Sequence, residues 1–203
     1  MELTIQEAVA VEPRLFTAEE YLAREECALE KSQFDNGKII PIPGGTYEHN
    51  LITANAIGEI RNALRAKNSP CVVLSSDMKI YIATQTKFYY ADASVVCSAP
   101  KFYVGRRDAI ENPTVIVEVA SDSTGLFDRT DKFDWYATLE TFKEYVLIAQ
   151  KQPHVEVWTH QKDNIWEMRI YKAPDDRVRL ATIDCEIDLS KIYASINFEE
   201  KTV

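Results

Sequence analysis

The stretch PTVIVEVA, residues 113–120, decides how the rest of this chain is interpreted. It is an apolar run rich in β-branched side chains, which is typical of a buried strand. Glu118 places a carboxylate inside this run, where it would face a protein core. Burying an unpaired carboxylate is costly, so its charge is usually offset by a partner, a raised pKa or a metal ion. Glu118 is therefore the first candidate for a functional residue.

A second acid, Asp92, lies in a similar setting within YYADASVVC, residues 89–97. We expect it in the middle of a strand next to the strand of Glu118. Two acids on adjacent apolar strands suit a divalent cation, and oxygen ligands suit Mg²⁺ and Mn²⁺ better than zinc. We expect one principal Mg²⁺ (or Mn²⁺) held by Asp92, Glu118 and the backbone carbonyl of Val119.

Length and composition predict one cytoplasmic domain. The chain has 203 residues, of which 46% are hydrophobic, and no run of eighteen apolar residues that could cross a membrane. We expect an N-terminal arm over residues 1–14 and a single domain over 15–203. The first residues lack the features of a signal peptide. Four scattered cysteines favour reduced thiols over a disulfide scaffold or a zinc site.

The net charge of −9 weighs against a protein that grips a nucleic-acid backbone along a broad basic face. Two local basic clusters remain, one over residues 101–107 and one over residues 61–67. Ordinary solvated charge explains both clusters more simply than a nucleic-acid patch.

The expected elements alternate in a way that predicts an α/β fold with a central mixed sheet flanked by helices. A capping box at Thr17 and Glu20 begins a helix, and Thr46 caps a long second helix. The strand over 113–119, the helix over 127–140 and the strand over 143–149 form one right-handed crossover if the strands are parallel. The expected helices are 18–27, 47–67 and 127–140, and the expected strands are 38–42, 71–82, 88–97, 113–119, 144–149, 154–159, 165–171 and 178–183.

The last strands form an additional C-terminal antiparallel meander that carries Trp158, Trp166 and Tyr171. Aromatic side chains on a partly exposed meander suggest a surface for self-association, and a two-fold homodimer is the commonest solution. We therefore expect a homodimer.

Two further residues complete a possible hydrolytic site. Lys132 lies one turn into the helix after Glu118, with Asp128 four residues earlier on the same face. His49 lies in the first turn of the long second helix. A lysine beside a metal-bound phosphate could orient water or offset charge. Each residue also has a structural interpretation: Asp92 as a turn acid, Glu118 and Lys132 as a structural ion pair, and His49 as a solvated side chain.

The order of these motifs resembles the Uma-two family of putative restriction endonucleases, within the PD-(D/E)xK nuclease superfamily. The resemblance spans roughly residues 15 to 190. The motifs that carry it are FTAEEYL (16–22), DNG (35–37), EHN (48–50), SDMK (76–79), DASVV (92–96), PTVIVEVASDST (113–124) and DRTDK (128–132).

The resemblance implies a restriction-endonuclease-like core, a divalent metal and hydrolysis of DNA. Asp92 then corresponds to the first acid of the motif and Glu118 to the second. The motif lysine would stand at Ala120, and Lys132 on the next helix fits the place of a migrated lysine. The family also places a histidine at His49, as a ligand or a proton-transfer group. The chain departs from the family pattern at Asp122 and at the alanine before Asp92.

Two functions remain open on the sequence. The first is a Mg²⁺- or Mn²⁺-dependent endonuclease acting on DNA, with no membrane partner. The alternative is a catalytically inactive interaction or regulatory module on the same fold, which the acidic charge and Ala120 favour.

Overall fold

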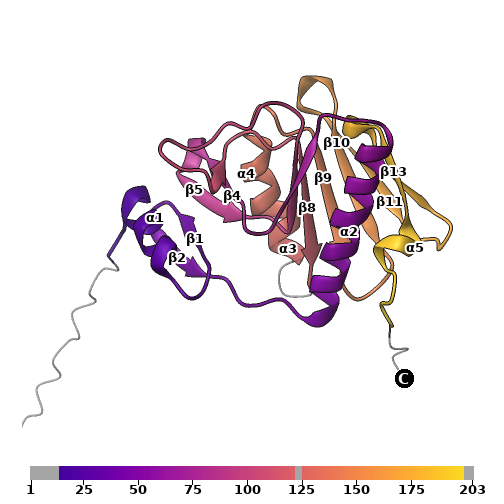
Figure 1. Cartoon of the computed structure of the whole chain (residues 1–203), viewed down its shortest axis with the longest axis horizontal. Coiled ribbons are helices and arrows are strands. Elements are labelled where there is room, and N and C mark those ends of the chain that lie inside the picture. Colours follow the sequence, from indigo (N-terminus) through magenta and orange to yellow (C-terminus); the bar gives the residue numbers. More distant parts are fainter. Residues whose placement is uncertain (1–13, 122–124, 199–203) are drawn as a thin grey trace, which may run out of the picture.

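The computed structural model describes residues 14–121 and 125–198. The arm predicted for residues 1–14 therefore lies outside the described residues, apart from Arg14. The described chain contains a six-stranded mixed sheet in the order β11-β10-β9-β8-β6-β3 (Figure 1). Its strands are β3 (Val72–Ser75), β6 (Ala93–Val96), β8 (Val115–Ala120), β9 (Glu144–Ala149), β10 (Val155–His160) and β11 (Trp166–Tyr171). The predicted central mixed sheet is confirmed, because β8 and β9 are parallel and their other neighbours are antiparallel.

A second sheet of five strands has the order β2-β1-β5-β4-β7. It comprises β1 (Ser32–Asp35), β2 (Lys38–Pro41), β4 (Lys79–Ile82), β5 (Lys87–Tyr90) and β7 (Ala109–Ile110). The expected strand 38–42 is β2, which lies at the edge of this sheet. An edge position tolerates Pro41, because proline has no N–H to donate to a neighbouring strand. The helix α1 (Ala18–Cys27) begins with the predicted capping box between Thr17 and Glu20. It packs Tyr21 and Leu22 against this sheet.

Helices cover the two faces of the six-stranded sheet. The long helix α2 (Tyr47–Ala66), capped by Thr46 as predicted, lies over one face (Figure 1). Its apolar stripe packs against Val115, Val117 and Val119 of β8. A helical segment after β8 covers the other face and packs against Ile116 and Ala120. Alternate residues of β8 thus face two separate cores.

The helical segment on the second face has three parts. These are α3 (Gly125–Phe127), a π-helix named η2 (Asp128–Lys132) and α4 (Phe133–Ala137). The predicted helix over 127–140 therefore exists, but it ends at Ala137, where the hydroxyl of Thr138 donates to the Trp135 carbonyl. The remaining elements are three short 3₁₀ segments, two strands and one short helix. They are η1 (Ala83–Gln85), η3 (Lys162–Asn164), η4 (Ala181–Ile183), β12 (Arg177–Leu180), β13 (Cys185–Asp188) and α5 (Leu189–Ile192).

Two predicted strands are broken, and this corrects the position of Asp92. The expected strand 71–82 is β3 and β4, and the expected strand 88–97 is β5 and β6, with each half in a different sheet. Asp92 lies in the break between β5 and β6, not in the middle of a strand. The sequence conceals this break because β5 and β6 are buried along their whole lengths. The expected strand 178–183 likewise ends at Leu180.

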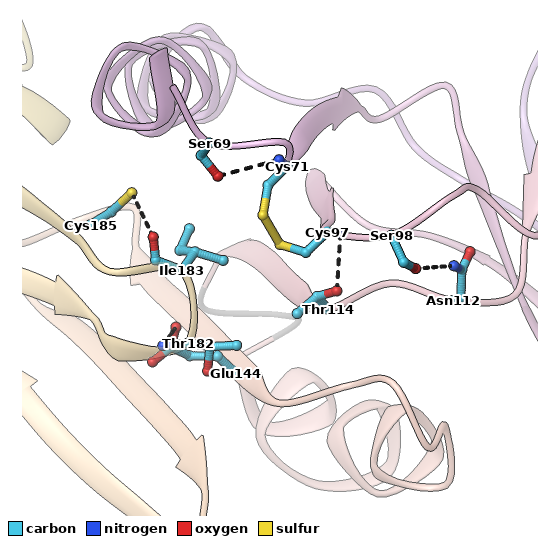
Figure 2. The surroundings of a disulfide bond; sticks show 10 residues. All are labelled: Ser69, Cys71, Cys97, Ser98, Asn112, Thr114, Glu144, Thr182, Ile183 and Cys185. Carbon is cyan, nitrogen blue, oxygen red and sulfur yellow. Dashed lines mark hydrogen bonds between the residues drawn. A yellow bond between two sulfur atoms is a disulfide. The ribbon is translucent and has the colours of Figure 1, made fainter. Parts of the chain in front are cut away.

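The cysteine expectation is also corrected. Cys71 and Cys97 form a disulfide (Figure 2). The pairing of the strands explains this disulfide. Val72 of β3 pairs with Val96 of the antiparallel strand β6, so Cys71, just before β3, lies opposite Cys97, just after β6. Cys27 and Cys185 remain free thiols.

The aromatic side chains of the meander point mainly inward. Trp158 and Trp166 pack against Phe133, with ring centroids 4.7 and 5.0 Å apart. The exposed apolar side chains of the meander are instead those of Ile165, Met168 and Ile170. Trp158, Trp166 and Tyr171 are half-buried, and the homodimer stays a prediction. Among the described residues, no helix is long and apolar enough to cross a membrane.

Candidate active site

Asp92 is held at the point where the pairing of β6 with β8 ends. The last paired residues are Ala93 and Val117. The next N–H group of β8 on this side belongs to Val119, and it donates to Oδ2 of Asp92 at 2.7 Å. The N–H and C=O of one strand residue point to the same side, so the Val119 carbonyl also faces the neighbourhood of Asp92. The side chain of Asp92 is 17% exposed and lies next to the strand of Glu118.

Glu118 points into the core beneath the helical segment. Its Oε1 lies 2.8 Å from Nζ of Lys132 and accepts a hydrogen bond from the hydroxyl of Tyr136 at 3.2 Å. Burial raises the pKa of Glu118 to about 8, and the ammonium of Lys132 only partly offsets this effect. The predicted proximity of Lys132 and Glu118 is therefore present in the structure.

Lys132 is held between two carboxylates. Its Nζ lies 3.4 Å from Oδ1 of Asp128, four residues earlier, as well as 2.8 Å from Glu118. Burial would lower the pKa of Lys132, but the two carboxylates raise it, so the side chain remains an ammonium at neutral pH. A buried ammonium that contacts the carboxyl groups of Glu118 and Asp128 has partners that offset the cost of its burial.

The direction of the β8 side chains shows how position 120 and Lys132 each lie relative to Glu118. Residues 118 and 120 share one face of β8, and Ala120 packs in the core that the helical segment covers. A lysine at 120 would approach Glu118 from the strand itself. Lys132 reaches the same carboxylate from the opposite layer.

His49 approaches Asp92 from α2. Its Nε2 lies 3.2 Å from Oδ2 of Asp92, and this hydrogen bond raises the pKa of His49 despite partial burial. The start of α2 is fixed over the end of β9, because Gln150 donates to Oγ1 of Thr46 at 2.7 Å. Gly45 leaves room for the imidazole, since a Cβ there would lie 2.8 Å from Nδ1 of His49. His49 is thus a positioned partner of Asp92 and not a solvated side chain.

Other polar residues of the family motifs are not part of the described site. The side chain of Asp77 is 82% exposed and pairs with Lys31 at the surface. Ser123 and Thr124 lie outside the described residues. The basic clusters are partly neutralised, because Arg106 pairs with Asp108 and Glu26.

The sequence matches a known protein family. A model of the Uma2 (Uma-two) family, described as "Putative restriction endonuclease", matches residues 18–190. The chain belongs to the Uma2 family. Two uncharacterized proteins of Synechocystis sp. are similar in sequence. The protein sll1609 is 37% identical over 158 residues, covering 78% of this chain and 88% of the relative. The protein slr1290 is 30% identical over 188 residues, covering 92% and 95%.

A solved structure shares the fold of this Uma2 chain. It is described as a putative nuclease belonging to DUF820 from Anabaena variabilis, with a TM-score of 0.68 and 16% identity. The match covers 88% of this chain and 97% of the solved chain. Together with the family match, this likeness confirms the predicted restriction-endonuclease-like α/β fold.

The residues of this Uma2 chain fit a magnesium-type cation in the chemistry of their donor atoms. Asp92, Glu118 and the Val119 carbonyl supply oxygen only, as Mg²⁺ and Mn²⁺ prefer. Among the described residues, no three His, Cys, Asp or Glu side chains converge as a closed metal cage. Two carboxylates and a carbonyl would leave other coordination positions for water and phosphate oxygens.

Tyr136 is a site residue that the sequence analysis missed. It is fully buried, and its hydroxyl contacts the same oxygen of Glu118 as Lys132 does. The signal was present in the sequence, because Asp128, Lys132 and Tyr136 recur at four-residue spacing on one face of a helix.

Proposed function

We propose that this Uma2 protein is a divalent-metal-dependent endonuclease that hydrolyses DNA phosphodiester bonds. The contact of Lys132 Nζ with Glu118 Oε1 at 2.8 Å is the observation that carries the proposal. A structural ion pair alone would not require Asp92 beside it, fixed by the amide of Val119 and by His49. The family and the shared fold support a nuclease, while the metal, the substrate and the roles of individual residues belong to the proposal.

Each residue has a distinct role in this proposal. Asp92, Glu118 and the Val119 carbonyl would hold Mg²⁺ or Mn²⁺, which supplies positive charge at the phosphate and lowers the pKa of bound water. The ammonium of Lys132 would orient the attacking water or offset the charge that develops on the phosphate. His49 would hold a proton at Nε2 that can pass to the leaving oxygen.

Nicking of supercoiled plasmid DNA with Mg²⁺ or Mn²⁺ tests this function. We expect cleavage by the wild type, and its loss in Asp92→Ala and Glu118→Ala. Asp77→Ala is the matched control, because it removes an exposed acid that lies in a surface ion pair. Inactivity of the wild type with every metal and DNA form, or unchanged cleavage by Asp92→Ala, would refute the proposal.

The alternative function is an inactive interaction or regulatory module. The acidic net charge of −9 and the internal pairing of Arg106 favour it, because few cations remain for a phosphate backbone. Calorimetry separates the two functions. An Mg²⁺ or Mn²⁺ isotherm that disappears in Glu118→Ala supports the nuclease, and the absence of metal binding supports the module.

We further propose that the protein acts in the cytoplasm as a homodimer, which would place two sites on opposite strands of a duplex. The edge strand β11, with exposed Met168 and Ile170, is the candidate surface. Light scattering at tens of micromolar tests the dimer, and a mass of 23.2 kDa would exclude it.

A further inference from the structure

The π-helix η2 is fixed to the sheet at a second place, away from Lys132. Glu156 of β10 is buried, and Arg129 of η2 binds it through two nitrogens. The Arg129 Nη2 lies 2.8 Å from Oε1, and Nε lies 3.2 Å from each carboxylate oxygen. The same carboxylate contacts Nε2 of His154 at 2.9 Å and accepts from Nε1 of Trp158 at 3.3 Å. The buried carboxylate of Glu156 is therefore positioned to bind a guanidinium.

The two buried carboxylates lie in one row across the sheet. Glu118 of β8 pairs in register with Leu147 of β9, and Leu147 pairs with Glu156 of β10. Neighbouring strands are about 4.8 Å apart, so the two carboxylate-bearing residues are separated by about 10 Å on the same face. The helical segment crosses this row, with Lys132 at one end and Arg129 at the other.

The hydroxyl of Tyr145 on β9 fixes Asp128, the first residue of η2. It donates to the backbone carbonyl of Asp128 at 3.0 Å. In the π-helix the backbone bonds run from each residue to the fifth along the chain, and such segments are rare and often lie at functional sites. Side chains of β8, β9 and β10 therefore each hold one residue of the segment from Asp128 to Lys132.

We propose that the Arg129–Glu156 pair is a positioning device that sets the ammonium of Lys132 against Glu118. The guanidinium fork fits the carboxylate with two parallel contacts, which fixes the rotation of η2 in a way that a single point charge does not. Lys132 lies three residues after Arg129 in η2, so a rotation of η2 would also move Lys132. This inference rests on the proposed nuclease function only for its catalytic consequence, because the placement of Lys132 can be measured without DNA.

The test measures the access of reagent to the amine of Lys132. Lysine acylation with site-resolved mass spectrometry is compared between the wild type, Glu156→Gln and Arg129→Lys. The side chain of Lys132 is 7% exposed, and Lys79 is a matched reporter with a side chain 6% exposed in the other sheet. We expect acylation of Lys132 to become about tenfold faster in both variants, while that of Lys79 changes by less than about twofold.

Arg169→Lys is the control variant, because Arg169 forms an exposed ion pair with Glu167 on β11 that does not involve η2. Unchanged acylation of Lys132 in both test variants would overturn the proposal. A rise at Lys79 equal to that at Lys132 would also overturn it, since it would indicate general loosening.

A double-mutant cycle tests the catalytic consequence. Arg129→Lys should lower kcat for plasmid nicking by about tenfold with KM nearly unchanged, and should cost nothing further in a Lys132→Met background. Additive losses would contradict a role through Lys132. If the wild type does not cleave DNA, the proposed function fails, and the acylation result still decides the placement of Lys132.

Discussion

Glu118→Gln should make the protein more stable at alkaline pH, by an amount that follows from the burial of this carboxylate. Burial raises the pKa of Glu118 from its ordinary value of 4.5 to about 8. Between these pH values the folded protein retains a proton that the unfolded chain has lost. Stability from this group is fully present below pH 4.5 and is lost as the pH rises to about 8.

The magnitude follows from the two pKa values. Their difference of about 3.5, at about 1.4 kcal/mol for each pKa unit, corresponds to about 5 kcal/mol over the whole interval. Glutamine has the same shape and does not titrate. The stability of Glu118→Gln minus that of the wild type should therefore rise by about 1.4 kcal/mol per pH unit from pH 4.5 to 8 and be constant above pH 8.

Urea unfolding followed by tryptophan fluorescence at pH 5, 6, 7, 8 and 9 measures this difference. Glu140→Gln makes the same chemical change at an exposed position and serves as the control. A difference between Glu118→Gln and the wild type that does not vary with pH, or that falls as pH rises, would show that the Glu118 carboxylate is not desolvated as described.

Three further predictions concern separate parts of the molecule. Lys132→Met should retain Mg²⁺ binding by calorimetry but slow plasmid nicking by about two orders of magnitude, and wild-type cleavage by this variant would exclude a catalytic lysine there. Gly45→Ala should slow nicking as much as His49→Ala does, because its Cβ would lie 2.8 Å from Nδ1 of His49; Gly44→Ala has open space and should cleave normally, so equal effects of the two glycine variants would contradict this reasoning. Dithiothreitol should lower the free energy of unfolding by about 3 kcal/mol, measured by urea unfolding, because the disulfide closes a loop with a sequence separation of 26; Cys71→Ser should not respond to dithiothreitol, and a wild type that also fails to respond would argue against the disulfide.

Local signals in the sequence were sufficient to predict where some elements begin. The capping residues Thr17 and Thr46 predicted the starts of α1 and α2, because a hydroxyl that accepts from an early helix amide acts within one turn. Asn36 and Gly37 both adopt positive φ and form the turn between β1 and β2, but of these two strands only β2 was expected from the sequence.

The break at Asp92 could not be predicted in this way. The residues on both sides are buried, and hydrophobic periodicity does not tell whether two consecutive buried strands belong to one sheet or to two. The disulfide was missed for a related reason. Pairing of Cys71 with Cys97 depends on the register of β3 and β6, which spacing along the sequence does not define.

The candidate site was partly predictable, because its chemistry is encoded in residue types but its geometry depends on tertiary contacts. A buried acid at Glu118 required compensation, and Lys132 lies on the following helix, four residues after Asp128 on the same face. The participation of Tyr136 and the anchoring of Arg129 on Glu156 depend on which residues face each other across the sheet and η2. Periodicity along one element cannot provide that information.

The charges around Glu118 indicate that, at the proposed metal site, a cation and a proton would compete. Asp92, Glu118 and Asp128 carry three negative charges when ionised, whereas Lys132 and protonated His49 carry two positive charges. Glu118 retains a proton up to about pH 8, and this proton compensates part of the excess negative charge. A divalent cation at the carboxylate pair would compensate the same charge. Because a metal ligand must lose its proton, cation binding should release protons and strengthen as pH rises toward 8. A lysine at position 120 would add to Lys132, so Ala120 preserves the negative charge that a divalent cation needs.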